Sequence, residues 1–320
     1  MSELGGLFDL HDTPLQKIES SFLKERGIEL LIKREDLNHP GLSGNKLHKL
    51  KYNLYKAKEE GHNTLLTFGG AYSNHIYAAA AAGKAFGFRT IGIIRGEEYL
   101  PLNPTLKFAV ESGMTLHYMS RSNYRQKHTA YIIEQLKSEF GNFYLIPEGG
   151  TNNLAVKGCA EIINSIEIDF DIICTACGTG GTLAGLIAGL NGNRYALGFS
   201  VLKGASFLNK DVKNLLINSG YGQLNNWNIN LDYHFGGYAK INSDLVSFVN
   251  SFEKENDLKI EPIYTGKMLY GLYDLIFKNK INEGSRIIAL HTGGLQGLAV
   301  LMTKYSGLYS RLNTFEGKTK

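Results

Sequence analysis

The stretch FDIICTACGTGGTLAGLIAGL, residues 170–190, decides the fold class. Its first part, FDIIC, is a short apolar run of the kind that forms a strand buried on both faces of a sheet. Its last part, GGTLAGLIAGL, is apolar over the length of a helix. Because a glycine-rich loop joins the two parts, the stretch predicts half of a βαβ unit, and therefore an α/β protein with parallel strands.

The same alternation of strand and helix runs along most of the chain. Six further strand-like runs are each followed by a helical pattern: NTLLTF (63–68), TIGIIRG (90–96), TLHYMS (115–120), NFYLIP (142–147), ALGFSVL (196–202) and SRIIALH (285–291). The helical pattern after the last run is GLQGLAVLMTKY, residues 294–305. Short apolar runs separated by helices indicate a three-layer αβα arrangement of mostly parallel sheets. A chain of 320 residues is long enough to form two lobes.

The composition excludes several classes of protein. The net charge is only +4, and acidic residues occur even in the lysine-rich segment 46–60, where Glu59 and Glu60 follow Lys56 and Lys58. A nucleic-acid partner is therefore not expected. The N-terminal MSELGGLFDLHD has no apolar signal region, and no stretch reaches the length of a membrane span. We expect a cytoplasmic protein that binds no membrane.

Three cysteines are too few, and odd in number, for a disulfide framework. Cys174 and Cys177 form a single C-x-x-C, which could be a redox pair or half of a zinc site. No second pair and no nearby histidine would complete a zinc site, and a redox pair needs an exposed thiol, whereas this one ends a buried strand. We expect both cysteines to serve packing, and we expect no metal site.

Three loops that follow strands are rich in glycine and hydroxyl residues: GGAYSNH (69–75), CGTGGT (177–182) and HTGG (291–294). In open α/β sheets, ligands bind beyond the carboxyl ends of the strands. In the second loop, backbone N–H groups at a helix start could hold a phosphate; the residues are Gly178, Thr179, Gly180, Gly181 and Thr182. The dinucleotide fingerprint fails at Leu183, and no Walker lysine follows. A glycine-rich turn without a ligand stays an alternative.

LSGNKLHKL, residues 42–50, places a Ser43-Gly44-Asn45 turn before Lys46, at the start of an amphipathic helix. The positive end of the helix dipole and partial burial both favour a neutral amine there. A neutral lysine, a phosphate-binding loop and a hydroxyl-bearing loop together suit pyridoxal 5′-phosphate, whose aldehyde forms a Schiff base with a lysine.

These motifs resemble the fold-type II pyridoxal-phosphate enzymes related to tryptophan synthase β, and within them the D-cysteine desulfhydrase and 1-aminocyclopropane-1-carboxylate deaminase family. The matching segments run in the family's order from IKREDL (32–37) to HTGG (291–294). The resemblance implies a two-lobed, tryptophan synthase β-like fold and a homodimer. Residues 1–48 and 157–320 would form the large cofactor-binding domain, and residues 49–156 a small inserted domain.

The resemblance also implies roles for single residues. GNKLHKLK carries the Schiff base onto Lys46, which then moves the substrate's α-proton as a free amine. In YSNH, Asn74 would contact the phenolic oxygen of the cofactor, and Ser73, Asn74 and His75 would hold the substrate carboxylate. His75 could equally cap the helix or pack.

The remaining motifs supply the rest of the implied site. GTGGT (178–182) would bind the cofactor phosphate. GGY and IYTGK would supply two catalytic tyrosines, Tyr238 near the reactive carbon of the substrate and Tyr264 against the cofactor ring. HTGG would place Thr292 at the pyridine nitrogen.

The expected reaction is β-elimination from a small D-amino acid such as D-cysteine, so the enzyme would be a lyase or deaminase. A hydroxyl at the pyridine nitrogen gives a weak electron sink, which suits loss of a thiolate. The cyclopropane deaminases, which resemble this chain, carry Glu where Thr265 stands and Gln where His75 stands. Their reaction is the alternative, and a non-catalytic pyridoxal-phosphate-binding protein is a remote one. Ser43 and Gln296-Gly297 depart from the desulfhydrase pattern.

Overall fold

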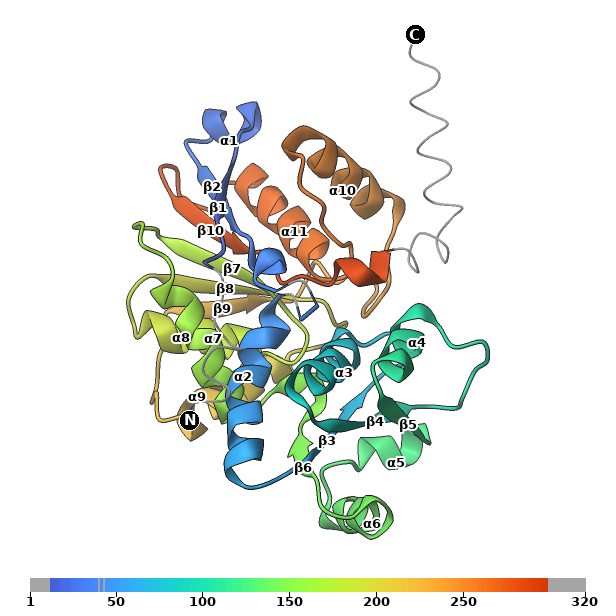
Figure 1. Ribbon diagram of the computed structural model, residues 1–320. Helices are drawn as coiled ribbons and strands as arrows, with labels where there is room; N and C mark the ends of the chain where they lie inside the picture. Colours follow the sequence, from blue (N-terminus) through green and yellow to red (C-terminus); the bar gives the residue numbers. More distant parts are fainter. Residues whose placement is uncertain (1–11, 40, 43, 299–320) are drawn as a thin grey trace.

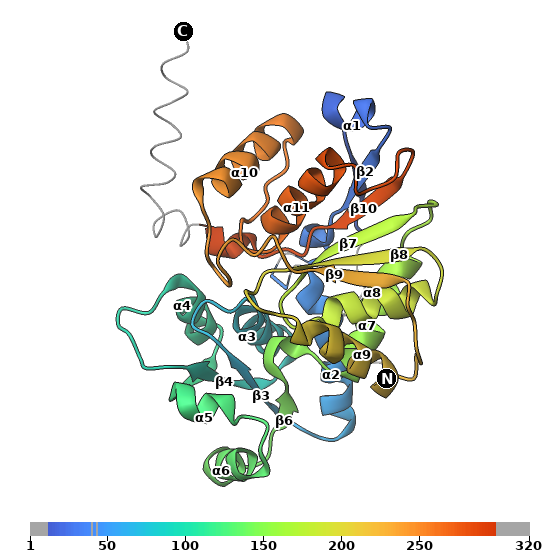
Figure 2. The same ribbon diagram turned by 180° about the vertical axis from the view of Figure 1, so that it is seen from behind.

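The computed structural model describes residues 12–39, 41–42 and 44–298, and the chain forms two separate sheets there (Figures 1 and 2). The larger sheet has the strand order β1-β2-β10-β7-β8-β9, and only the β1–β2 pair is antiparallel. Its strands are β1 (Leu15–Ile18), β2 (Glu29–Lys33), β7 (Ile172–Cys177), β8 (Tyr195–Ser200), β9 (Trp227–Asn230) and β10 (Arg286–Leu290).

The smaller sheet has four parallel strands in the order β5-β4-β3-β6. They are β3 (Thr64–Gly69), β4 (Arg89–Arg95), β5 (Met114–Met119) and β6 (Tyr144–Ile146). Every strand predicted from an apolar run is present to within three residues, so the α/β class with mostly parallel sheets is confirmed. The sequence patterns missed β1, β2 and β9.

Helices cover both faces of the larger sheet and complete three layers (Figure 1). One apolar core lies between the sheet and α7, α8 and α9, and a second lies between the opposite face and α1, α10 and α11. The bounds are α1 (Ser21–Glu25), α7 (Asn153–Asn164), α8 (Gly181–Leu190), α9 (Phe207–Asn218), α10 (Ser243–Asn256) and α11 (Thr265–Phe277). Three short 3-10 helices are η1 (Glu35–Leu37), η2 (Glu148–Gly150) and η3 (Leu295–Gly297).

The smaller sheet is also covered on both faces. Alternation along β3 sends Leu65 toward α2 and α3, and Leu66 and Phe68 toward α5 and α6. The helices are α2 (Asn45–Glu59), α3 (Asn74–Phe86), α4 (Pro104–Glu111), α5 (Arg121–Arg125) and α6 (Ala130–Phe140). Because α2 also packs against α7, it joins the two sheets.

Cys174 and Cys177 are free and buried, and they lie in different cores on opposite faces of the larger sheet. Strand residues three apart point to opposite faces. The two thiols therefore cannot form a redox pair with each other, which agrees with the packing role expected from the sequence.

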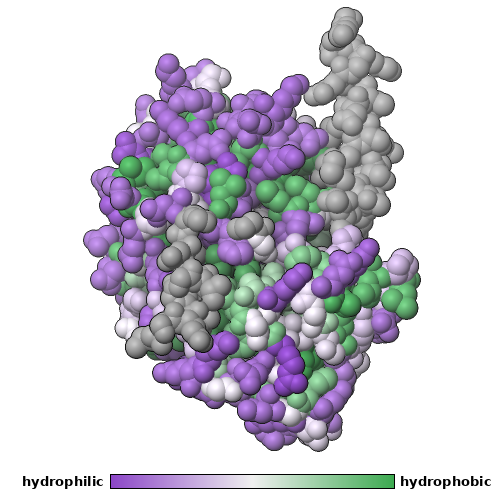
Figure 3. Space-filling view, viewed as in Figure 1, coloured by the Kyte–Doolittle hydropathy of each residue, from purple (hydrophilic) through white to green (hydrophobic). Residues whose placement is uncertain are grey.

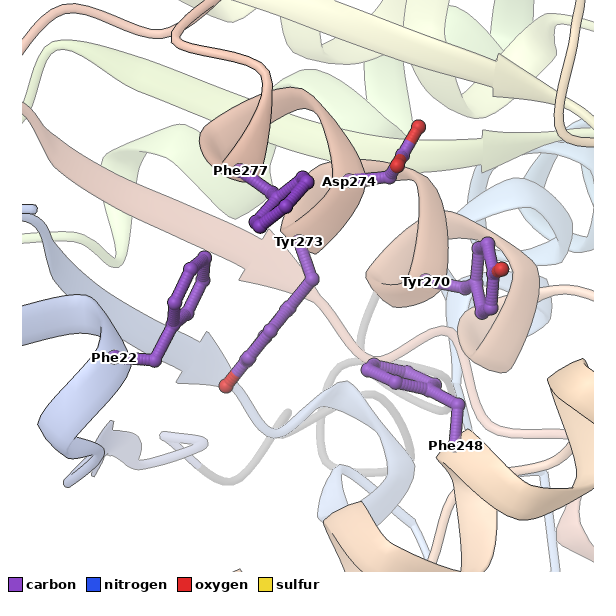
Figure 4. Close-up of a pocket in the computed structure, with 6 residues that line it drawn as sticks. All are labelled: Phe22, Phe248, Tyr270, Tyr273, Asp274 and Phe277. Atoms are coloured by element: carbon purple, nitrogen blue, oxygen red, sulfur yellow. The ribbon is translucent and has the colours of Figure 1, made fainter.

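The surface carries one aromatic hollow between α1, α10 and α11, lined by Phe22, Phe248, Tyr270, Tyr273, Asp274 and Phe277 (Figure 4). None of the predicted site residues lines it. Elsewhere, hydrophilic side chains cover most of the face in Figure 3, with apolar ones in smaller groups. No helix in the described part of the chain is long and apolar enough to cross a membrane. The helix predicted over 294–305 lies mostly outside the described residues.

Candidate active site

Loops from both sheets meet at the carboxyl ends of β3, β7 and β10. A pocket lies at this junction, and its walls include Asn74 from the smaller sheet and Tyr238 and Tyr264 from the larger one. The full lining is Tyr72, Asn74, Thr105, Tyr238, Ala239, Glu261, Ile263, Tyr264, Gly294 and Gly297. The position beyond parallel strand ends is where α/β folds bind ligands.

The turn before Lys46 packs directly on the HTGG loop. Gly44 has φ +83° and ψ −164°, a backbone conformation that is essentially restricted to glycine. A Cβ added at Gly44 would lie 2.0 Å from the carbonyl oxygen of Thr292. The N–H of Asn45 donates to the same oxygen at 3.4 Å. Only glycine allows the Lys46 turn and Thr292 to approach this closely.

The charged segment KRED, residues 33–36, is hydrogen-bonded to this turn. The N–H of Gly44 donates both to the carbonyl of Glu35 and to Oδ1 of Asn38, each at 2.9 Å. The Glu35 carboxylate accepts from the Thr13 hydroxyl at 2.6 Å and from Nε2 of His48 at 2.5 Å. Burial opposes ionisation of Glu35, but the effects of His48, Thr13 and Lys33 together outweigh it and hold the Glu35 pKa below its usual value. These residues position Lys46.

Lys46 itself is partly buried on the first turn of α2. Among the residues that the structure describes, its Nζ makes one long hydrogen bond, to Oδ1 of Asn45 at 3.4 Å. Burial, followed by the charge of Lys49, lowers the pKa of Lys46 to about 7. A large share of this amine is therefore neutral at neutral pH, which is the state that a nucleophile or a general base needs.

Lys49 is a site residue that the sequence reasoning missed. Its buried Nζ donates to the carbonyl of Gly149 at 3.1 Å and to the hydroxyls of Thr151 at 3.0 Å and Thr179 at 3.4 Å. A Cβ added at Gly181 would lie 3.0 Å from this nitrogen. The available signal was the spacing, since residues three apart on a helix share a face with Lys46.

The glycine-rich loop and Lys49 together could hold an anion. The loop ends at the N-terminus of α8, where backbone N–H groups have no helical partner. Gly180 has φ +76°, and Asn45 Nδ2 donates to Thr182 Oγ1 at 2.7 Å, which fastens the loop to the Lys46 turn. Unpaired N–H groups beside a buried ammonium are the donor set that a phosphate requires, so the residues fit pyridoxal 5′-phosphate.

The two predicted tyrosines lie together. The rings of Tyr238 and Tyr264 meet edge to face with centroids 6.1 Å apart, and a Cβ added at Gly178 would lie 3.4 Å from the ring of Tyr264. Burial raises the pKa of Tyr264 well above its ordinary value, so its hydroxyl is protonated at neutral pH. The ring of Tyr264 thus lies beside Gly178, at the start of the glycine-rich loop, and Tyr238 packs against Tyr264.

Two buried charged residues hold these tyrosines, and the sequence reasoning missed both. The Glu261 carboxylate accepts the N–H groups of Tyr264 at 2.9 Å and Thr265 at 2.6 Å, at the start of α11. Burial raises the Glu261 pKa to about 7. Lys267 Nζ donates to the carbonyls of His234 and Gly237, each at 2.8 Å, directly before Tyr238. Burial lowers the Lys267 pKa to about 8.

The YSNH loop borders the pocket and the HTGG loop. The Ser73 hydroxyl caps α3 by accepting from the N–H groups of His75 at 3.2 Å and Ile76 at 3.3 Å. Asn74 Oδ1 accepts from Gln296 Nε2 at 3.1 Å. The imidazole of His75 is buried, with Nε2 2.7 Å from the Thr67 hydroxyl, whereas Asn74 lines the pocket itself.

A lysine of lowered pKa, a phosphate-binding helix start and two tyrosines at the junction of two parallel sheets define a pyridoxal-phosphate enzyme site. The family described as "Pyridoxal-phosphate dependent enzyme" matches residues 7–293. The chain belongs to this family, so the predicted cofactor and class of enzyme are confirmed.

Two relatives and one solved structure are similar to this chain over most of its length. The chain is 32% identical to a putative 1-aminocyclopropane-1-carboxylate deaminase of Pyrococcus horikoshii, over 89% of this chain and 90% of that protein. It is 33% identical to the bifunctional D-cysteine desulfhydrase/1-aminocyclopropane-1-carboxylate deaminase of Arabidopsis thaliana, over 91% and 79%. A solved structure titled as an ACC deaminase homologue superposes with a TM-score of 0.81 at 30% identity, covering 92% of this chain and 93% of that one. These matches confirm the predicted fold.

Proposed function

We propose that this enzyme catalyses β-elimination from a small D-amino acid, with D-cysteine as the type substrate and a keto acid, ammonia and sulfide as products. The observation that carries the proposal is the Lys46 amine, whose pKa of about 7 suits proton transfer, at the junction that also holds Tyr238 and Tyr264. The name of the Arabidopsis relative includes the same reaction.

The cofactor, when bound, supplies an aldehyde that bonds covalently to the substrate nitrogen and a ring that withdraws electrons from the α-carbon. Lys46 holds the cofactor and then, as a free amine, takes the proton from the α-carbon. Lys49 and the N–H groups of 178–182 would hold the phosphate, and Thr292 would be the partner of the pyridine nitrogen. The contacts of Lys49 with Thr179 and the packing of the Lys46 turn on the Thr292 backbone support these assignments.

The remaining residues orient the substrate. Asn74 serves the phenolic oxygen of the cofactor and, with Ser73 and the N–H groups at the start of α3, the substrate carboxylate. Tyr264 packs against the ring, and Tyr238 moves a proton near the β-carbon. The side chain of His75 is buried against Thr67, so we propose a separate role for it below.

Ring opening of 1-aminocyclopropane-1-carboxylate is the second candidate, favoured by the names of the Pyrococcus relative and of the solved structure. Thr265 is fully buried, and its N–H is bonded to Glu261, so no carboxylate side chain projects from this position. The test is kcat/KM for D-cysteine against the cyclopropane substrate. We expect a preference for D-cysteine; a preference for the cyclopropane would reverse the assignment.

A protein that only binds the cofactor is the remote alternative. Keto-acid detection over a panel of D- and L-amino acids tests it, because turnover of none of them would remove the enzymatic proposal.

We further propose a cytoplasmic homodimer, as the family likeness implies, and light scattering at several concentrations measures the mass of the assembly. The proposed domains remain 1–48 with 157–320, and 49–156, and limited proteolysis near residue 156 would test the boundary.

A further inference from the structure

The imidazole of His75 has a fixed tautomer. It lies at the start of α3 with only 2% of its surface exposed, and its Nε2 is 2.7 Å from Oγ1 of Thr67. The Thr67 hydroxyl donates its one proton to the carbonyl of Ile146 at 2.8 Å. Since that proton is already used, Nε2 must carry a hydrogen and donate it to Thr67. The other nitrogen, Nδ1, is therefore an unprotonated acceptor.

This acceptor is buried and has no hydrogen-bond partner among the described residues. A Cβ added at Gly150 would lie 3.3 Å from Nδ1 and 3.5 Å from the Cβ of Lys49. The free edge of the ring therefore faces the chain after β6 and the lysine-bearing face of α2. Burial, followed by the charges of Lys46 and Lys49, lowers the pKa of His75 well below its ordinary value, so the ring stays neutral. A buried acceptor without a donor is costly to leave unpaired.

Of the two nearby amines, Lys46 makes the fewer hydrogen bonds to the described residues. Lys49 Nζ already reaches three acceptors, at Gly149, Thr151 and Thr179. Lys46 lies three residues earlier on the same helical face, and its Nζ has one hydrogen bond of 3.4 Å. Its flexible side chain can turn toward His75 without giving up a strong contact.

We propose that Nδ1 of His75 accepts a hydrogen bond from the Lys46 amine whenever that amine is not joined to the cofactor. His75 is then a positioning residue, which holds the released base in place through the Thr67–Ile146 hydrogen-bond chain. This inference rests on the proposed role of Lys46. It also separates His75 from the substrate carboxylate, because a nitrogen lone pair would repel that group.

The hydrogen bond has a measurable effect on Lys46. An acceptor stabilises the ammonium more than the neutral amine, so it raises the Lys46 pKa against the effect of burial. The charged or titratable groups facing Lys46 are Lys49, which lowers its pKa, and Cys159, which raises it. Neither changes when the side chain at position 75 is replaced, so both serve as a constant background.

The test is competitive acetylation of the cofactor-free protein across pH, with fragment-ion mass spectrometry that separates Lys46 from Lys49. His75→Gln keeps a polar atom for Thr67 and removes the Nδ1 acceptor, whereas His75→Asn keeps an acceptor near Nδ1 and loses the Thr67 contact. We expect the Lys46 pKa to fall by roughly one unit in His75→Gln. In His75→Asn it should stay near the wild-type value, and Lys49 should stay unchanged in both variants.

Nitrogen-15 NMR of the wild-type imidazole gives a second readout that no substitution can disturb by unfolding the protein. We expect the neutral Nε2–H tautomer. Protonation at Nδ1, an unchanged Lys46 pKa in His75→Gln, or equal falls at Lys46 and Lys49 would each overturn the proposal. So would an unchanged Lys46 with a raised KM in His75→Gln, because the acceptor would then serve the substrate amine. Neither readout needs turnover, so loss of the proposed reaction would leave this result intact.

Discussion

Replacing Gly44 by alanine should separate the Lys46 turn from the HTGG loop. The new methyl group would lie 2.0 Å from the carbonyl oxygen of Thr292 and 2.6 Å from its carbon, so the backbone of one loop must move. The backbone conformation of Gly44 costs another residue about 1–3 kcal/mol. Forcing a methyl into packed surroundings costs about 1–3 kcal/mol more. We expect the free energy of unfolding to fall by about 2–6 kcal/mol.

Gly61→Ala is the matched control, because Gly61 also has a positive φ of +74° but nothing lies within 4 Å of its added Cβ. Its free energy of unfolding should fall only by the cost of the positive φ, about 1–2 kcal/mol. Denaturant unfolding followed by circular dichroism measures both variants, and visible absorbance measures the affinity for added pyridoxal phosphate. Gly44→Ala should lose cofactor affinity as well, and Gly61→Ala should keep it. Equal losses of stability with full cofactor binding in both would refute the account of this contact.

Three further predictions concern the charges of the site. Lys49→Met should weaken cofactor binding about 10-fold to 100-fold by loss of a charged donor, measured by titration; unchanged affinity would remove Lys49 from the phosphate site. Because the Lys46 pKa is lowered to about 7 and the base must be neutral once the substrate has released it, kcat should rise as pH increases through about 7; a kcat profile falling there would contradict this role. Lys267→Met should lower kcat more than it raises KM, because Tyr238 loses its support, and unchanged steady-state kinetics would argue against that coupling.

The larger features of the fold could be predicted because they follow from local patterns. The runs around Ile173, Leu66 and Ile93 are apolar on both faces, and this composition is typical of central parallel strands. The strands β1, β2 and β9 were missed because they are short or carry charged residues. In β2, Lys33 is buried, and its Nζ donates to the carbonyls of Thr13 at 2.6 Å and Ser165 at 3.5 Å, contacts that the sequence does not display.

Some residues of the candidate site could likewise be predicted from the sequence, and others could not. Lys46, Tyr238 and Tyr264 could be proposed from motifs: a glycine turn precedes Lys46, a glycine pair precedes Tyr238, and Tyr264 lies in IYTGK. Lys49 and Lys267 are found only from the structure, because their partners lie about 30 to 130 residues away. A buried lysine looks like a surface lysine until the carbonyls and hydroxyls that surround it are brought together.

The central claim is that the cofactor is joined to Lys46, and borohydride reduction of the purified protein with bound pyridoxal phosphate tests it most directly. Reduction fixes the link, and peptide mass spectrometry then gives its position. We predict a single modified lysine at Lys46, with loss of the visible absorbance band. A modification at Lys49, the other buried amine of this junction, or no modification of either residue would contradict the account.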